Sequence, residues 1–175
     1  TRCTHPNDAN GAIQGGDARS FQRWLEKYVA MARRKGATPL LITPVTRVVK
    51  DRTDRSKGVF PILTTTHLRR QGSVRGDYSQ TVRDTARANG VALIDLDARS
   101  IAAVNRLGHP AWKRYWLAVS AAQYPHYAPG VIGNVGTPDT VHFQQAGARW
   151  LADMVIAGIK ADDGGTLERL ADLFN

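Results

Sequence analysis

The stretch Val91-Ala92-Leu93-Ile94-Asp95-Leu96 is a short apolar run that predicts a buried β-strand. A second run of the same kind, Pro39-Leu40-Leu41-Ile42-Thr43, ends at Pro44. Continuous apolar runs are typical of strands in a parallel sheet that is covered on both faces. Each run follows residues with helical spacing, the first helix between Asp17 and Gly36 and the second over 77–89. This alternation predicts an α/β protein with a parallel sheet.

The rest of the chain predicts further helices and long loops. Asp97 is suited to cap a helix whose apolar face is Ile101, Val104 and Leu107 and which ends at Gly108. The other predicted segments are a polar loop over 46–76 with a short strand or turn, a short helix around 112–119, a loop over 123–141, a helix over 144–160 and a terminal turn over 166–174. Two strands make a poor parallel sheet, so the predicted sheet is incomplete.

The composition is that of an ordinary folded domain. The chain has 175 residues, of which 42% are hydrophobic and 22% charged, and this suits one domain with a sizeable core. No apolar run is long enough to span a bilayer, so we expect no membrane partner. The single cysteine, Cys3, excludes an internal disulfide framework. Because the first residue is Thr1 rather than Met, we expect a processed or partial product.

The formal net charge of +9 raises the question of nucleic-acid binding. Arginines are spread from Arg2 to Arg169, and no helix-turn-helix, zinc-finger or RNP-type pattern accompanies them. We therefore expect no nucleic-acid partner and keep a basic nucleic-acid-binding protein as the weaker alternative. An acidic polysaccharide or an anionic cell surface suits a diffuse positive charge equally well.

The tetrapeptide Asp139-Thr140-Val141-His142 is the strongest candidate for catalytic chemistry. A carboxylate three residues before an imidazole can reach the ring Nδ1 within one turn. It would then hold the tautomer and stabilise the imidazolium while Nε2 accepts a proton from a nucleophile. The alternative is an aspartate in a turn followed by a capping or surface histidine.

The sequence around this tetrapeptide resembles one enzyme family. Asp139-Thr140-Val141-His142-Phe143 and the following Gln144-Gln145-Ala146-Gly147-Ala148 are similar to the last block of the SGNH (GDSL-type) hydrolases, in their rhamnogalacturonan acetylesterase-like branch. The same branch is resembled by Gly36-Ala37-Thr38-Pro39-Leu40-Leu41-Ile42-Thr43-Pro44-Val45-Thr46-Arg47, by Tyr78, Ala86 and the strand after Gly90, and by Ser100 and Leu107-Gly108. The resemblance covers roughly residues 17–160.

The resemblance implies a fold and an activity. The fold would be a three-layer α/β/α sandwich, the flavodoxin-like SGNH fold, with a central parallel sheet of about five strands. The activity would be hydrolysis of O-acetylated carbohydrate or a small ester through a serine acyl-enzyme, without a cofactor. His142 would act as general base and then acid, and Asp139 would orient it. A secreted or periplasmic location is also implied by the resemblance alone.

The family's nucleophile motif, G-D-S, is absent from the sequence. Gly16-Asp17-Ala18 would be a degenerate copy, but no apolar strand precedes it, and we interpret Asp17 as a helix cap. Asn7-Asp8 matches the family's third block, in which Asn7 would donate its amide to the oxyanion hole; the alternative is an ordinary Asn-Asp turn. With Asn7 as anchor, we expect the nucleophile and the first strands to lie upstream of Thr1.

Several features leave alternatives open. His126, Tyr124, Tyr127 and Trp116 would either line a sugar-binding rim or form a packed aromatic cluster, and Arg47 would face the substrate or pair with a carboxylate. No histidine has zinc-ligand spacing, so we expect no metal. A non-catalytic relic or carbohydrate-binding module is the second functional hypothesis. Exposed sheet edges and apolar surface lead us to expect aggregation or homo-oligomers.

Overall fold

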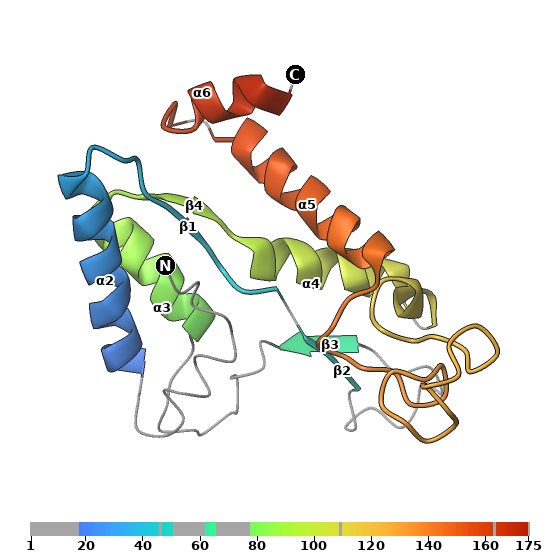
Figure 1. Ribbon diagram of the computed structural model, residues 1–175. Helices are drawn as coiled ribbons and strands as arrows, with labels where there is room; N and C mark the ends of the chain where they lie inside the picture. The colour runs from blue at the N-terminus through green and yellow to red at the C-terminus, as the bar shows by residue number, and fades with distance from the viewer. Residues whose placement is uncertain are drawn as a thin grey trace. The chain divides into compact units, whose positions relative to one another are not determined.

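The strands β1 (Leu40–Ile42) and β4 (Ala92–Ile94) pair in parallel in the computed structural model of the chain (Figure 1). The structure describes residues 18–45, 47–50, 62–65, 78–108, 110–162 and 164–174. These divide into two compact units. The first unit combines Thr1–Val45, Thr66–Asp97 and Ile156–Asn175, and the second combines Thr46–Thr65 and Ala98–Val155.

The first unit contains a strand-helix-strand crossover. Parallel strands cannot be joined by a hairpin, and here the helix α3 (Tyr78–Asn89) lies between β1 and β4 in the chain and contacts both. The register pairs Leu40 with Ala92 and Ile42 with Ile94. The helix α2 (Ala18–Arg34) packs on α3, where Phe21 meets the ring of Tyr78 edge-on at 5.0 Å. The sequence-based expectation of an α/β fold with parallel strands is thus confirmed at this level.

The helices α2 and α3 end as their glycines predict. Gly36 follows α2 and Gly90 follows α3, and each has a positive φ, which favours a residue without Cβ. The two helix ends are joined by the Arg33 guanidinium, which donates hydrogen bonds to the carbonyl oxygens of Asn89 and Gly90 at 2.7 and 3.2 Å. A cationic side chain near the carbonyl oxygens at the C-terminal end of a helix is favourable, because those oxygens lack partners within the helix.

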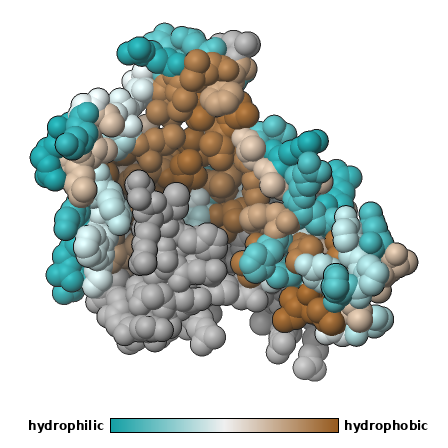
Figure 2. All heavy atoms as spheres, viewed as in Figure 1, coloured by the Kyte–Doolittle hydropathy of each residue, from teal (hydrophilic) through white to brown (hydrophobic). Residues whose placement is uncertain are grey.

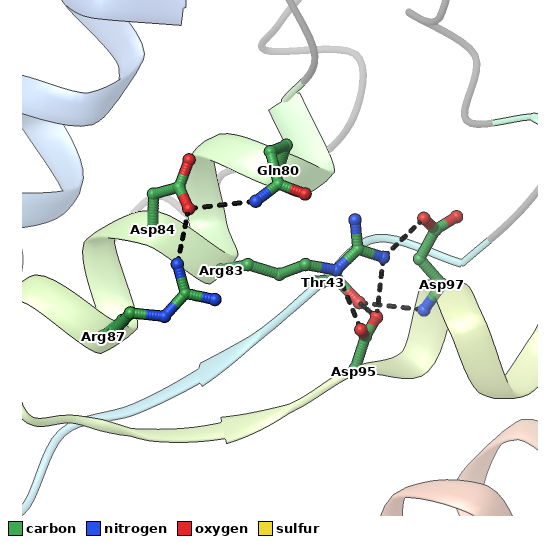
Figure 3. A network of polar contacts seen from close by, with 7 residues as sticks. All are labelled: Thr43, Gln80, Arg83, Asp84, Arg87, Asp95 and Asp97. Carbon is green, nitrogen blue, oxygen red and sulfur yellow. Dashed lines mark hydrogen bonds and ion pairs between the residues drawn. The ribbon is translucent and has the colours of Figure 1, made fainter.

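A buried polar network joins the carboxyl ends of β1 and β4 (Figure 3). Arg83 of α3 donates two hydrogen bonds to Asp95, at 2.8 and 2.9 Å, and a third to Asp97 at 2.9 Å. The Thr43 hydroxyl lies between them, donating to Asp95 and accepting from the Asp97 backbone N–H. The hydrogen bond with Asp95, together with that to Asp97, outweighs burial and raises the pKa of Arg83 further above its ordinary value. Arg83 therefore holds α3 to the residues that follow β4 as a permanent cation, and Thr43 joins these residues to the end of β1.

Some apolar side chains of the first unit reach the surface. Ile42 and Leu93, on β1 and β4, are 41% and 36% exposed, and Figure 2 shows apolar surface over the region of these strands. Apolar side chains exposed on a two-stranded sheet favour association. The expected aggregation or oligomerisation stays a prediction.

The end of the chain completes the first unit. The helix α5 (Gln145–Lys160) has its last turns there, and the short helices α6 (Glu168–Ala171) and η2 (Asp172–Phe174) follow. A Cβ on Gly158 would lie only 2.8 Å from the Ile94 side chain, so this glycine lets α5 approach β4 closely. The helices predicted over 144–160 and 166–174 are confirmed, with the second split into two short pieces.

The second unit is built around tryptophans. Its elements are the antiparallel strands β2 (Arg47–Lys50) and β3 (Ile62–Thr65), α4 (Leu96–Leu107) from Ala98 onward, η1 (Ala111–Arg114) and the first turns of α5. Its buried core residues are Val48, Val104, Trp112 and Trp116, with Tyr115, Phe143 and Trp150 packed against them. Trp116 is fully buried and meets Phe143 edge-on at 5.4 Å.

Two sequence-based boundaries need correction. The polar stretch 46–76, predicted as a loop with one short strand or turn, contains the β2–β3 ladder, which pairs Arg47 with Thr65 and Lys50 with Ile62. The strand predicted over 91–96 ends at Ile94, because α4 begins at Leu96. Asp97 therefore lies in the first turn of α4 rather than at its cap, and its backbone N–H bonds to Thr43. Asp17, the other predicted cap, lies outside the described residues, as does Asp77, the first residue of the helix predicted over 77–89.

We expect Arg83→Met to lower the free energy of unfolding by about 3 kcal/mol, because it removes a cation from the Asp97 carboxylate, whose side chain is only 5% exposed. The matched control is Arg87→Met on the same helix. Its ion pair with Asp84 is exposed on both sides, so its loss should cost under about 0.5 kcal/mol. Urea unfolding followed by circular dichroism measures both values. Equal effects of the two substitutions would contradict a stabilising role for the network.

Candidate active site

Asp139 and His142 face each other on one turn of the second unit, directly before α5. The Nδ1 atom of His142 lies 2.7 Å from Oδ2 of Asp139. The second carboxylate oxygen, Oδ1, accepts hydrogen bonds from the backbone N–H groups of Val141 and His142, at 2.7 and 3.1 Å. The aspartate thus closes the turn with one oxygen and holds the imidazole with the other.

The two side chains differ in exposure. The Asp139 side chain is 14% exposed, whereas the His142 side chain is 66% exposed. Among the residues that the structure describes, no hydrogen-bond partner is given for the ring Nε2. With Nδ1 engaged by the carboxylate, a neutral ring carries its proton there and presents Nε2 as a proton acceptor. The alternative of an aspartate that only shapes a turn does not account for the ring contact.

The hydrogen bonds of Asp139 outweigh its burial. Burial raises the pKa of the carboxyl group, but the bond to His142 and the two backbone N–H donors lower it, and the net result is a pKa below the ordinary value of 3.8. The carboxylate is therefore ionised at neutral pH. An ionised carboxylate at Nδ1 stabilises an imidazolium that forms when Nε2 takes a proton.

The backbone of residues 113–117 supports this turn. Leu117 accepts a hydrogen bond from the Asp139 N–H and donates one to the His142 carbonyl, both at 2.9 Å. Two residues further on, the Gln144 N–H donates to the Tyr115 carbonyl, also at 2.9 Å. Trp116 and Phe143 pair between these bonds as an antiparallel bridge. Hydrogen bonds to Leu117 thus fix the backbones of both Asp139 and His142.

The loop between these two segments is also pinned internally. The Asn134 side chain, on a buried residue, donates to the Tyr127 carbonyl at 2.6 Å and accepts from the Gly136 N–H at 2.9 Å. Val119 and Asn134 pair as an isolated bridge. Although 123–141 lacks periodicity, as predicted, backbone hydrogen bonds of turns and isolated bridges, together with the Asn134 side chain, hold it in one course.

Two other residues singled out from the sequence lie outside the described part of the structure. These are Asn7 and the side chain of Arg47. Ser79 and Ser100 are buried within α3 and α4. No serine is among the partners that the structure describes for His142. In the described residues there is no group of three His, Cys, Asp or Glu side chains that would hold a metal ion.

The aromatic residues separate into two groups. Trp116 belongs to the packed cluster of the core, as one of the two sequence-based alternatives expected. Tyr124 is 47% exposed, and His126 is exposed beside it, so these two remain available to a ligand.

Within the described ranges, none of the helices has the length and apolarity that a bilayer crossing needs.

Sequence reasoning missed Gln144. Its side-chain amide donates hydrogen bonds to the carbonyls of Lys113 and Trp116, at 3.0 and 2.7 Å. The signal available in the sequence is Gly147, whose missing side chain indicates a close approach of backbone: a Cβ there would lie 2.1 Å from the Tyr115 carbonyl oxygen. That pattern alone does not reveal which segment approaches.

We expect the Asp139 carboxyl group to titrate below pH 3.8 in the folded chain. Its stabilising contribution is then fully present above the ordinary carboxyl pKa and is lost as pH falls through the lowered folded-state value. In His142→Ala the pKa of Asp139 should rise, because a hydrogen bond to the carboxylate is removed. Carbon-13 NMR of the side-chain carboxyl groups measures both, with Asp139→Asn to assign the signal. An unchanged titration in His142→Ala would contradict the contact.

Two curated proteins of Bacillus subtilis (strain 168) are similar to the chain over 141 residues, which is 81% of its length. "Probable rhamnogalacturonan acetylesterase YesY" is 30% identical, with 51% of that protein covered. "Rhamnogalacturonan acetylesterase RhgT" is 26% identical, with 52% covered. The chain thus spans about half the length of these relatives, and no protein-family model matches it. The resemblance to rhamnogalacturonan acetylesterases that the sequence predicted is confirmed, since both of these relatives carry that name.

Proposed function

We propose that the chain is part of an SGNH-type ester hydrolase in which Asp139 and His142 supply two members of a Ser-His-Asp triad. The observation that carries this proposal is the 2.7 Å contact between Nδ1 of a largely exposed imidazole and a carboxylate whose other oxygen is already engaged. In this arrangement Asp139 stays ionised and His142 presents Nε2 outward. Both are properties that a general base needs.

The proposed reaction proceeds in two displacements. Nε2 of His142 takes the proton of a serine hydroxyl as its oxygen attacks the acetyl carbonyl. The imidazolium, stabilised by Asp139, then gives that proton to the sugar oxygen as the ester bond breaks and leaves an acetyl-serine. Water, deprotonated by the same Nε2, attacks the acetyl-serine and releases acetate and the free serine. No metal or organic cofactor takes part.

The remaining parts of the site are also proposals. The nucleophilic serine would lie outside this sequence, since the sequence contains no G-D-S. Asn7 would donate its side-chain amide to the oxyanion that forms in each displacement. The complete protein would have the three-layer α/β/α sandwich, with the chain as part of one SGNH-like domain and the β1–β4 pair as part of a larger parallel sheet. The crossover from β1 through α3 to β4 supports this fold.

The proposed substrate is an O-acetylated carbohydrate. The names of the two relatives support acetyl esters on a polysaccharide. The net charge of +9 also suits an acidic polysaccharide, because a diffuse positive charge raises the local concentration of an anionic polymer. Exposed Tyr124 and His126 are the aromatic residues of the 123–141 loop that we expect to contact sugar.

The test is hydrolysis of p-nitrophenyl acetate and of acetylated pectic fragments. We expect the protein that includes the sequence encoded before Thr1 to be active, and the 175-residue chain by itself to be nearly inert. His142→Ala should lower kcat/KM by about 10³-fold or more. The matched control is Gln145→Ala, an exposed position in the first turn of α5, which should retain catalysis of both substrates.

Two results would count against the proposal. Full activity in His142→Ala would show that this imidazole is not the base. An inert longer protein that still binds acetylated carbohydrate would instead support the non-catalytic binding module.

A further inference from the structure

We infer that Gln144 is a positioning residue that sets the direction of the His142 ring, an inference that rests on the proposed function of that histidine. Gln144 makes three hydrogen bonds to the 113–116 backbone. Its side-chain amide donates to Lys113 and Trp116, and its N–H donates to Tyr115. These bonds join the segment carrying the candidate base to residues about thirty positions earlier in the chain.

The side chain of Gln144 is suited to this task because it carries two N–H donors on one nitrogen. The Lys113 carbonyl belongs to η1 and the Trp116 carbonyl follows it, so one amide group spans the last turn of that helix. A carboxylate of the same length has no proton to donate and would place charge against two carbonyl oxygens. A lysine could donate hydrogen bonds, but it would bring a positive charge and would lack the acceptor oxygen of the amide. The amide therefore matches this pair of acceptors.

The position of Leu117 follows from this clamp. Leu117 is the next residue after Trp116, and it bonds to the backbones of both Asp139 and His142. When Gln144 holds the carbonyls of Lys113 and Trp116, the Leu117 peptide groups point at the turn. Within that turn, the N–H groups of Val141 and His142 orient the Asp139 carboxylate. Gln144 acts on His142 through this chain of hydrogen bonds, since the partners described for its side chain are the carbonyls of Lys113 and Trp116.

Close packing on the other side of Gln144 limits any compensating movement. Gly147, in the first turn of α5, lies so near the Tyr115 carbonyl that even a methyl group would meet it at 2.1 Å. Trp150, one turn further, stacks on the Tyr115 ring at 4.3 Å. The helix start is thus pressed against the same backbone that Gln144 binds. Loss of the amide donors would leave α5 in place and loosen the turn before it.

The experiment compares Gln144→Met with Gln145→Ala in the isotopically labelled protein. Methionine keeps the length of Gln144 and lacks donors, and Gln145 is an exposed neighbour of the same type. NMR would follow the Nδ1 proton signal of His142 and the hydrogen exchange of the Leu117, Asp139 and His142 amides. We expect Gln144→Met to weaken or shift the Nδ1 signal and to speed these exchanges roughly tenfold, since two hydrogen bonds are lost. Gln145→Ala should change neither.

In the active protein, Gln144→Met should lower kcat by about tenfold and leave KM unchanged, because the base is displaced while substrate binding is not. Gln144→Asn keeps the amide donors on a side chain that is one methylene shorter. Its kcat should lie between that of the unsubstituted protein and that of Gln144→Met. Faster exchange at residues of the first unit would indicate general destabilisation and overturn the inference. Unchanged Nδ1 and amide signals in Gln144→Met would also overturn it.

The NMR signals need no turnover, so the two proposals fail in different ways. If His142→Ala leaves hydrolysis intact while Gln144→Met still alters the Nδ1 signal, the proposed function is wrong and the hydrogen-bonded link from Gln144 to the ring is real, but it serves no catalysis. If His142→Ala abolishes hydrolysis and Gln144→Met leaves kcat unchanged, the proposed function holds and the positioning role is wrong.

Discussion

The candidate site depends on one constraint, which is that the backbone polar groups of the turn before α5 bond to residues 113–117. A turn without regular secondary structure has N–H and C=O groups that must find partners when they are removed from water. Here Leu117 and Tyr115 supply those partners to Asp139, His142 and Gln144. The Asp139 carboxylate then satisfies the N–H groups inside the turn. Because these hydrogen bonds fix the carboxylate through one oxygen, its other oxygen faces the imidazole.

The buried network of the first unit has a different role, although it lies where α/β proteins often bind ligands. The carboxyl ends of parallel strands commonly present such sites, and Thr43 and Asp95 follow β1 and β4 directly. Arg83, however, already forms ion pairs with both Asp95 and Asp97 from within the protein. A cation already bound in this geometry leaves the carboxylates committed to holding α3 against the strands. The network therefore supports stability, and the Asp139–His142 turn is the place for which we propose chemistry.

Much of the fold follows from short-range features of the sequence. The apolar runs at 40–42 and 92–94, and the glycines that end the helices with positive φ at Gly36, Gly90 and Gly108, lie where the pattern places them. The β2–β3 ladder escaped prediction because a strand in an antiparallel pair is stabilised by its partner across the sheet, here Arg47 with Thr65. The start of α4 was misplaced for a similar reason, since Thr43 bonds the Asp97 N–H from a distant part of the chain.

For the candidate site, the sequence by itself determined that a carboxylate and an imidazole can meet, because Asp139 and His142 are three residues apart and a single turn brings them into contact. Only the tertiary structure decided that the carboxylate is largely buried while the imidazole is exposed. It also decided that Gln144 binds carbonyls 31 and 28 residues away. Such contacts depend on how distant segments pack, and local patterns in a sequence carry little information about that packing.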